Sequence, residues 1–145
     1  MVRAACHCTA VRFELAEHPA WVLDCNCTIC RRYAALWSYY RGPDAAKLIR
    51  TSDAGSTDAY LWGDQSIAFH RCKTCGCVTH LAAVDGAPPR VFGINARLIP
   101  TLDPSRTRVV QMDNSHSGFF WTRAEDAPRA SRHPPMPKPG PEDWR

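Results

Sequence analysis

The placement of its cysteines constrains this chain more than any other feature. Eight cysteines occur within 145 residues, and all of them fall into three short clusters. The central cluster, Cys25-Asn-Cys-Thr-Ile-Cys30, brings three thiols together in a C-x-C-x-x-C spacing. Cys6-His-Cys8 lies upstream, and Cys72-Lys-Thr-Cys75-Gly-Cys77 lies downstream. We therefore expect a scaffold that brings these three clusters together.

Metal binding explains these thiols better than disulfide bonds do. The first residues, Met-Val-Arg-Ala-Ala-Cys, lack the apolar region of a secretory signal, so we expect a cytoplasmic protein with reduced thiols. Cys6 and Cys8, like Cys25 and Cys27, are too close in sequence to bridge to each other comfortably. A C-x-x-C pair followed by glycine is instead typical of a zinc knuckle.

The length favours one domain, which we place at residues 1–125, followed by a tail at 126–145. Six of the twelve prolines fall between residues 128 and 141, so this tail cannot keep a regular hydrogen-bond ladder. No stretch approaches the ~18 apolar residues of a membrane span. The formal charge is +4, but thiolates bound to zinc would cancel most of it, so nucleic acid is an unlikely partner. The oligomeric state is left open.

Short apolar and aromatic runs separated by turn residues predict a mainly β fold of short antiparallel strands with little helix. We also predict helical turns at 31–35 and 45–48. The predicted strands cover residues 11–15, 20–24, 36–40, 59–62, 66–71, 78–82, 90–94 and 108–112.

Two zinc sites are the simplest division of the thiols. One would be closed by four sulfurs, those of Cys6, Cys8, Cys72 and Cys75, with Gly76 in the left-handed turn that points backbone amides at them. Three sulfurs would hold the second zinc and leave it one open position, namely those of Cys25, Cys27 and Cys30. A fourth protein ligand could instead close that position, and the candidates are Cys77, His80, His70 and His7.

Four polar residues are candidates to contact a substrate beside the open zinc. Arg31 and Arg32 directly follow Cys30, while Asn95 and Arg97 lie in the run Gly93-Ile-Asn-Ala-Arg97. Guanidinium groups suit the carboxylates of a small substrate. Compensation of thiolate charge is the alternative role, because it uses the same donors.

Four ordered motifs resemble the glutathione-dependent formaldehyde-activating enzyme family, which also includes centromere protein V. They are Cys6-His-Cys-Thr-Ala-Val-Arg-Phe-Glu14, Cys25-Asn-Cys-Thr-Ile-Cys-Arg-Arg32, Phe69-His-Arg-Cys-Lys-Thr-Cys-Gly76 and Gly93-Ile-Asn-Ala-Arg97. The resemblance implies a small Mss4-like (β-tent) fold with one structural zinc and one exchangeable zinc. By position, Cys6, Cys8, Cys72 and Cys75 match the structural ligands, and Cys25, Cys27 and Cys30 match the catalytic ones.

The implied activity is that of a carbon–sulfur lyase, which forms or cleaves S-hydroxymethylglutathione from glutathione and formaldehyde. The chain departs from the family pattern at Ala5 and Thr9, where glycine is usual, at Ala34, where glycine is frequent at this position or nearby, and at Cys77, where threonine or serine is common. These departures bear on the substrate more than on the fold. The alternative function is a non-catalytic, zinc-stabilised binding module for a protein partner.

Overall fold

The computed structural model describes residues 1–40, 44, 47–61, 65–84, 92–103, 105–113 and 119–121. Within these residues the chain is mainly β, as predicted, with a single short α-helix and two 3-10 turns. The proline-rich tail and its boundary with the domain lie outside the described residues. No helix in the described part of the chain is long and apolar enough to cross a membrane.

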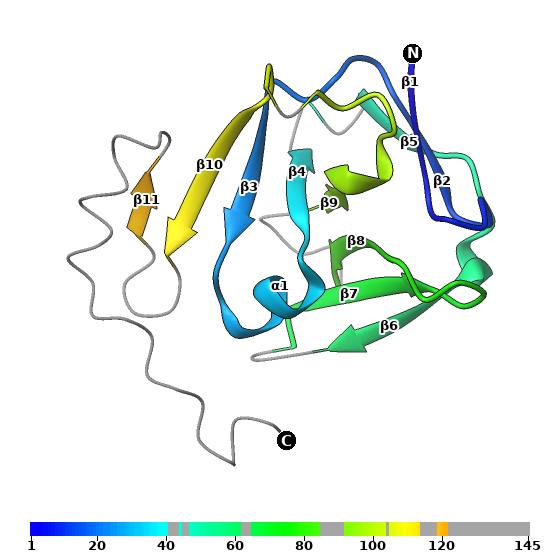
Figure 1. Cartoon of the computed structure of the whole chain (residues 1–145). Coiled ribbons are helices and arrows are strands. Elements are labelled where there is room, and N and C mark those ends of the chain that lie inside the picture. Colours follow the sequence, from blue (N-terminus) through cyan, green and yellow to red (C-terminus); the bar gives the residue numbers. More distant parts are fainter. Residues whose placement is uncertain are drawn as a thin grey trace.

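Short strands follow one another along the chain, interrupted once by the α-helix (Figure 1). The 3-10 turns are η2 (Ala54–Ser56) and η3 (Ala96–Leu98). The other elements are β1 (Val2–Ala5), β2 (Arg12–Leu15), β3 (Trp21–Cys25), α1 (Thr28–Tyr33), β4 (Leu36–Tyr40), β5 (Leu48–Arg50), β6 (Thr57–Leu61), β7 (Ile67–Cys72), β8 (Val78–Ala83), β9 (Phe92–Asn95), β10 (Arg108–Asp113) and β11 (Phe119–Trp121).

The strands form two sheets. A small sheet has the order β1-β2-β5, and a large sheet has the order β11-β10-β3-β4-β9-β8-β7-β6. Neighbouring strands are antiparallel except for β3 and β10, which pair in parallel, with Trp21 opposite Arg108. A parallel pair needs a long crossover connection, and here the chain between the two strands builds β4, β6, β7, β8 and β9 of the large sheet and β5 of the small one.

The fold has two hydrophobic clusters. Residues along strands of the large sheet belong to one cluster or the other, because their side chains alternate between the two faces of the sheet. Successive side chains point to opposite faces, so Val22 joins one cluster and Leu23 the other. The first cluster includes Phe13 and Leu15 of the small sheet, while the second includes Ile29 of α1 and Trp37 of β4. The small sheet and the helix therefore contribute to different cores.

The predicted strands are present, and several of their ends are shifted; residues 62, 90 and 91 of the predicted strands lie outside the described residues. Strand 36–40 is placed as predicted. The helix begins earlier than predicted, at Thr28, because the central cysteine cluster itself starts the helical turn. Residues 45 and 46 of the second predicted helical turn lie outside the described residues, and Lys47 is in a 3-10 conformation. Leu48 opens β5, because residues 48–50 pair with β2. Strands β1, β5 and β11 were not predicted, since each is short and held by its partner strand.

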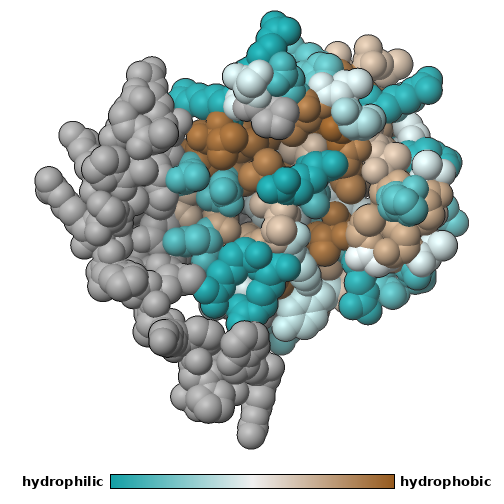
Figure 2. All heavy atoms as spheres, in the orientation of Figure 1, coloured by the Kyte–Doolittle hydropathy of each residue, from teal (hydrophilic) through white to brown (hydrophobic). Residues whose placement is uncertain are grey.

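The surface in this orientation mixes polar and apolar side chains (Figure 2). Apolar residues gather over the upper part of the described domain and are interrupted by hydrophilic ones. Strand β6 is an edge strand of the large sheet, and its Tyr60 and Leu61 are exposed.

Candidate metal centre

The first cysteine group joins the N-terminal hairpin to the turn that follows β7. The sulfurs of Cys6, Cys8, Cys72 and Cys75 all lie within 4.8 Å of one another. The Sγ atoms of Cys6 and Cys8 are 3.6 Å apart, as are those of Cys8 and Cys72. Tetrahedral zinc with Zn–S bonds of about 2.3 Å needs sulfurs about 3.8 Å apart. The four thiols therefore fit one closed tetrahedral site.

Backbone amides prepare this group to hold negative charge. The amide of Val11 donates to Cys6 Sγ at 3.3 Å. Backbone N–H groups of Cys77 and Cys8 lower the pKa of Cys75 to about 5. Those of Cys75 and Thr74 lower the pKa of Cys72, with the Cys75 amide the larger cause. Burial raises the pKa of Cys6 to about 12, so a cation is needed to keep all four sulfurs ionised together.

The turn that carries Cys72 and Cys75 depends on the glycine at position 76. Gly76 has φ +74°, in the left-handed region. Its N–H donates to the carbonyl of Cys72 at 2.9 Å, and the Cys72 N–H donates to the carbonyl of Cys77 at 2.9 Å. The turn therefore closes tightly behind the two ligands, as the sequence predicted.

The second cysteine group lies where β3 runs into α1. The sulfurs of Cys25, Cys27 and Cys30 lie within 4.8 Å of one another, and no His, Cys, Asp or Glu elsewhere among the described residues joins them. Cys25 ends β3, Cys27 precedes the helix, and Cys30 lies within it. Cys25 and Cys30 belong to the second hydrophobic cluster, whereas Cys6 and Cys72 belong to the first. The two groups thus lie in different cores.

Hydrogen bonds within the triad concentrate negative charge on one sulfur. The thiols of Cys25 and Cys30, followed by the backbone N–H groups of Cys30 and Ile29, lower the pKa of Cys27 to about 2. The pKa of Cys25 rises first because of its hydrogen bond with Cys27, and the pKa of Cys30 rises first because of its hydrogen bonds with Cys25 and Cys27. One thiolate shared by two thiols is a preformed cation site, because a metal ion can replace both shared protons.

Trp37 contacts the cysteine triad through a hydrogen bond. The indole N–H of Trp37 donates to Cys30 Sγ at 3.2 Å, and Trp37 is completely buried. The ring of Phe69 packs edge-on against it, with 6.1 Å between the ring centroids. Sequence reasoning missed this contact, although the position of Trp37 at the start of the strand after the cluster was a usable signal.

The other proposed ligands lie apart from the triad. Cys77 is half-buried and packs against the first hydrophobic cluster. His7, between two cysteines, is exposed. His70 and His80 stack with their ring centroids 4.2 Å apart, and His80 Nδ1 lies 2.9 Å from Thr79 Oγ1. These residues therefore do not group with the three sulfurs.

The predicted substrate residues gather near the helix end. Arg97 Nε donates to the carbonyl of Ala34 at 2.6 Å, and Ala34 lies four residues past Cys30. The exposed Arg97 is therefore held beside the end of α1. Arg32 Nη1 donates to the carbonyl of Thr28 at 2.8 Å. Arg31 is half-buried in the last turn of the helix. The structure thus brings arginines from two distant segments to the same helix.

Asn95 is tied to the backbone. Its Oδ1 accepts from the N–H groups of Leu36 and Arg97 at 3.4 and 3.2 Å, and its Nδ2 donates to the carbonyl of Val78 at 3.1 Å. The residue is buried. In the described structure its amide connects β4, β8 and η3, and contact with a substrate stays a prediction.

Two departures from the family pattern occupy strained backbone positions. Thr9, which follows Cys8, has φ 62°, and Ala34, which ends α1, has φ 48°. Both angles lie in the left-handed region, where glycine is easily accommodated and other residues are strained. The glycine usual at these positions therefore has a backbone reason.

A small β fold with one four-sulfur group and one three-sulfur group defines a class of protein that could hold metal ions at both groups. The family model of the glutathione-dependent formaldehyde-activating enzyme matches residues 1–109, and the chain belongs to that family. The membership supports a glutathione-dependent formaldehyde-activating or related enzyme.

A solved structure supports the fold. The chain is similar to the crystal structure of a Rhodobacter sphaeroides protein, with 28% identity and a TM-score of 0.58. The match covers 71% of this chain and 92% of the other. No curated protein matches the sequence.

Proposed function

We propose that this protein is a zinc-dependent carbon–sulfur lyase with two zinc ions per chain. Its substrates would be glutathione or a similar thiol and formaldehyde or another small aldehyde. The observation that carries the proposal is the triad of Cys25, Cys27 and Cys30, which converges without a fourth ligand among the described residues. Family membership supplies the thiol and the aldehyde as the expected substrates. A reducing compartment such as the cytoplasm suits this chemistry, because the free thiols must stay reduced.

The bound zinc would supply a position at which a substrate thiol loses its proton near neutral pH. In the synthetic direction, the substrate sulfur bonds to the aldehyde carbon, the carbonyl π pair moves to oxygen, and that oxygen takes up a proton. In the reverse direction the hydroxyl loses its proton, the carbonyl reforms and the carbon–sulfur bond breaks. Cys25, Cys27 and Cys30 hold the centre in place, and Trp37 orients Cys30 through its N–H.

The arginines beside the helix would position the thiol substrate. Glutathione carries two carboxylates, and guanidinium groups bind carboxylates through paired hydrogen bonds. Arg97 is held against the helix end through its Nε. Arg31 and Arg32 lie on the helix itself. We propose that Asn95 acts by holding η3, and with it Arg97, close to the triad.

Metal analysis combined with cobalt substitution tests the proposal. We expect two metal ions per chain, and glutathione should shift the thiolate charge-transfer band of the cobalt protein. Cys27→Ser should fold, retain one metal ion and lose carbon–sulfur lyase activity. Cys72→Ser is the matched control and should unfold or destabilise the domain, because Cys72 lies in the first core.

Two results would contradict the assignment. A cobalt spectrum that no small thiol changes, with a fourth protein ligand at the triad, would favour the binding-module alternative. Unfolding caused by Cys27→Ser but not by Cys72→Ser would mean that the structural and catalytic roles of the two groups are reversed.

A further inference from the structure

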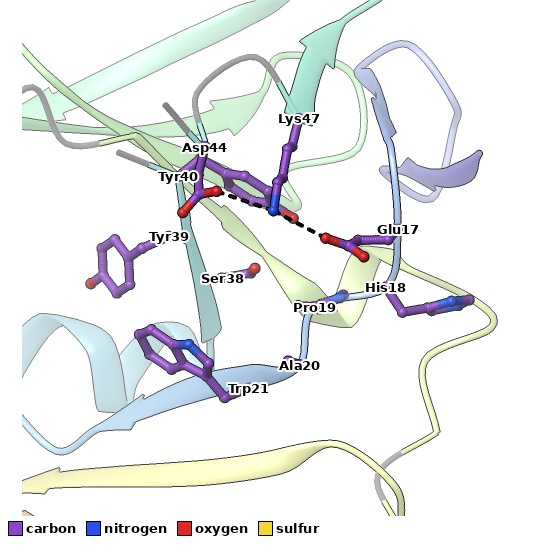
Figure 3. Close-up of a pocket in the computed structure, with 10 residues that line it drawn as sticks. All are labelled: Glu17, His18, Pro19, Ala20, Trp21, Ser38, Tyr39, Tyr40, Asp44 and Lys47. Carbon is purple, nitrogen blue, oxygen red and sulfur yellow. Dashed lines mark hydrogen bonds and ion pairs between the residues drawn. The ribbon is translucent and has the colours of Figure 1, made fainter. Parts of the chain in front are cut away.

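The hollow between the start of β3 and the end of β4 is lined by charged side chains that pair with one another (Figure 3). Lys47 Nζ lies 3.1 Å from Glu17 Oε1 and 3.1 Å from Asp44 Oδ1. These three side chains satisfy one another and need no ligand. A cysteine beside the candidate metal centre carries chemistry that the proposed function does not use.

Cys77 is the one cysteine that belongs to neither sulfur group. The chain has eight cysteines, of which four form the first group and three form the second. Cys77 is half-buried and packs against the first hydrophobic cluster, as Cys8 and Cys75 do. Its thiol therefore lies in the core of the four-sulfur group and not in that of the triad.

The hairpin of β7 and β8 places Cys77 directly opposite Cys72. Arg71 pairs with Val78 in this ladder, and the Cys72 N–H donates to the carbonyl of Cys77 at 2.9 Å. Cys72 and Cys77 are therefore the next pair toward the turn. Side chains of directly opposite residues lie on one face with their Cβ atoms about 4.5–5.5 Å apart. Cys77 thus presents its sulfur on the same side of the hairpin as Cys72.

Hydrogen bonds tie the Cys77 thiol to both halves of the four-sulfur group. The thiol accepts a hydrogen bond from the backbone N–H of His7, which lies between Cys6 and Cys8, and it shares another with the thiol of Cys75. Backbone N–H groups also point at the sulfurs of Cys6 and Cys75. The Cys77 sulfur is therefore prepared for negative charge in the same way as the sulfurs of the group.

The spacing of Cys77 from Cys72 is itself that of a zinc ligand pair. Zinc sites commonly use two cysteines with about two to four residues between them. Cys72 and Cys75 have two intervening residues, and Cys72 and Cys77 have four. A Cβ added to Gly76, which lies between Cys75 and Cys77, would meet nothing within 4 Å. The turn therefore has free space beside the segment that would have to shift.

We propose that Cys77 is a reserve ligand, which completes the four-sulfur group when Cys75 cannot bind the metal ion. Cys75 is half-buried and open to solvent reagents, whereas Cys72 is buried. The ligands after exchange would be Cys6, Cys8, Cys72 and Cys77, so the ion would keep four thiolates and the same net charge. The exchange involves the four-sulfur group alone and does not depend on whether the triad is catalytic.

Metal binding by the full chain tests the proposal with Cys75→Ala, Cys77→Ser and the double variant, each loaded with zinc or cobalt. Both single variants should retain as many metal ions per chain as the wild type, and the double variant should lose one. Cys75→Ala should weaken binding at this group only by roughly 10- to 100-fold, because the amides that point at Cys75 lose their ligand. Its cobalt charge-transfer band should stay as intense as that of the wild type, because the number of thiolates is unchanged.

Alkylation by iodoacetamide, mapped by mass spectrometry, supplies a second readout. Cys77 should react readily in the metal-loaded wild type, where it binds no metal. In metal-loaded Cys75→Ala it should be protected, and a chelator should restore its reaction. Unfolding of the double variant alone would support the proposal, because Cys77→Ser by itself should fold.

Four results would overturn the proposal. Cys75→Ala could lose the metal ion or unfold, which would show that Cys77 does not replace Cys75. Cys77 could react equally fast in the wild type and in Cys75→Ala. The double variant could hold the metal as tightly as Cys75→Ala does. Cys77→Ser alone could lose a metal ion, which would make Cys77 a permanent ligand and not a reserve one.

Discussion

Replacing Trp37 with phenylalanine tests whether the metal affinity of the triad depends on a single hydrogen bond. The indole N–H lies 3.2 Å from Cys30 Sγ in a completely buried position. A hydrogen bond to a charged group contributes about 1.5–3 kcal/mol, and it stabilises the thiolate form that binds metal. Its loss should therefore weaken binding at the triad by roughly 10- to 100-fold, the usual range for partners of metal ligands. The four-sulfur group should keep its metal, because it lies in the other core.

The assay is a competition titration against a chromophoric chelator, with the cobalt charge-transfer band as a second readout. Two variants separate the hydrogen bond from general effects of packing. Phe69→Leu removes the ring that packs on Trp37 but leaves the N–H in place. Trp21→Phe changes an exposed tryptophan at the other end of β3. Both should keep the affinity of the triad close to that of the wild type.

The reasoning fails if folded Trp37→Phe binds its second metal ion as tightly as the wild type. It also fails if Phe69→Leu weakens binding as much as Trp37→Phe does. In that case packing around Cys30 would set the affinity of the site, and the hydrogen bond would contribute little.

Three further predictions concern stability, each measured by urea unfolding of the metal-loaded protein. Ala34→Gly should stabilise the fold by about 0.5–1 kcal/mol, because φ at this helix end is 48°; the control Ala35→Gly should not stabilise it. Asn95→Ala should cost about 2–4 kcal/mol, because three backbone groups lose their partner; a cost below 1 kcal/mol would contradict this. Burial lowers the pKa of His80 from 6.5 to about 3, so the unfolded chain is protonated first. The contribution of His80 to stability should be constant above pH 7 and fall by roughly 2 kcal/mol at pH 5; His80→Phe should lose this part of the pH dependence, and an unchanged slope would refute the assignment.

Sequence reasoning identified the compact cysteine clusters because ligand spacing is a local property, whereas the meeting of Cys6 and Cys8 with Cys72 and Cys75 depends on the fold. C-x-C and C-x-x-C place their sulfurs on one side of a tight turn whatever surrounds them. The left-handed turn at Gly76 follows from the same local rule, and the structure confirms it. The family resemblance added the order of the motifs, and the family match confirms it.

Strand partners were harder to predict, because pairing depends on distant segments. Residues 48–50 form β5 only through their ladder with β2. β10 joins β3 in parallel, although more than eighty residues separate Trp21 from Arg108. Local propensity carries no information about either pairing, since strand preference mainly reflects the neighbours against which a strand packs.

The role of Asn95 shows the same limit within the site. Its motif indicated contact with a substrate, but the side chain is held by Leu36, Val78 and Arg97. Only the folded chain brings these three backbone groups around one amide. Sequence pattern identifies a polar residue near the site, while tertiary contacts decide how its donors and acceptors are used.

The sequence alone determined that the cysteines form compact clusters and that the fold is mainly β, because both follow from spacing and alternation over a few residues. The tertiary structure decided that Cys6 and Cys8 meet Cys72 and Cys75, that the two sulfur groups lie in different cores, and that Trp37 donates to Cys30. These outcomes depend on which distant strands pair and in which register. Register sets the face on which every side chain lies, and no local pattern specifies it across such separations.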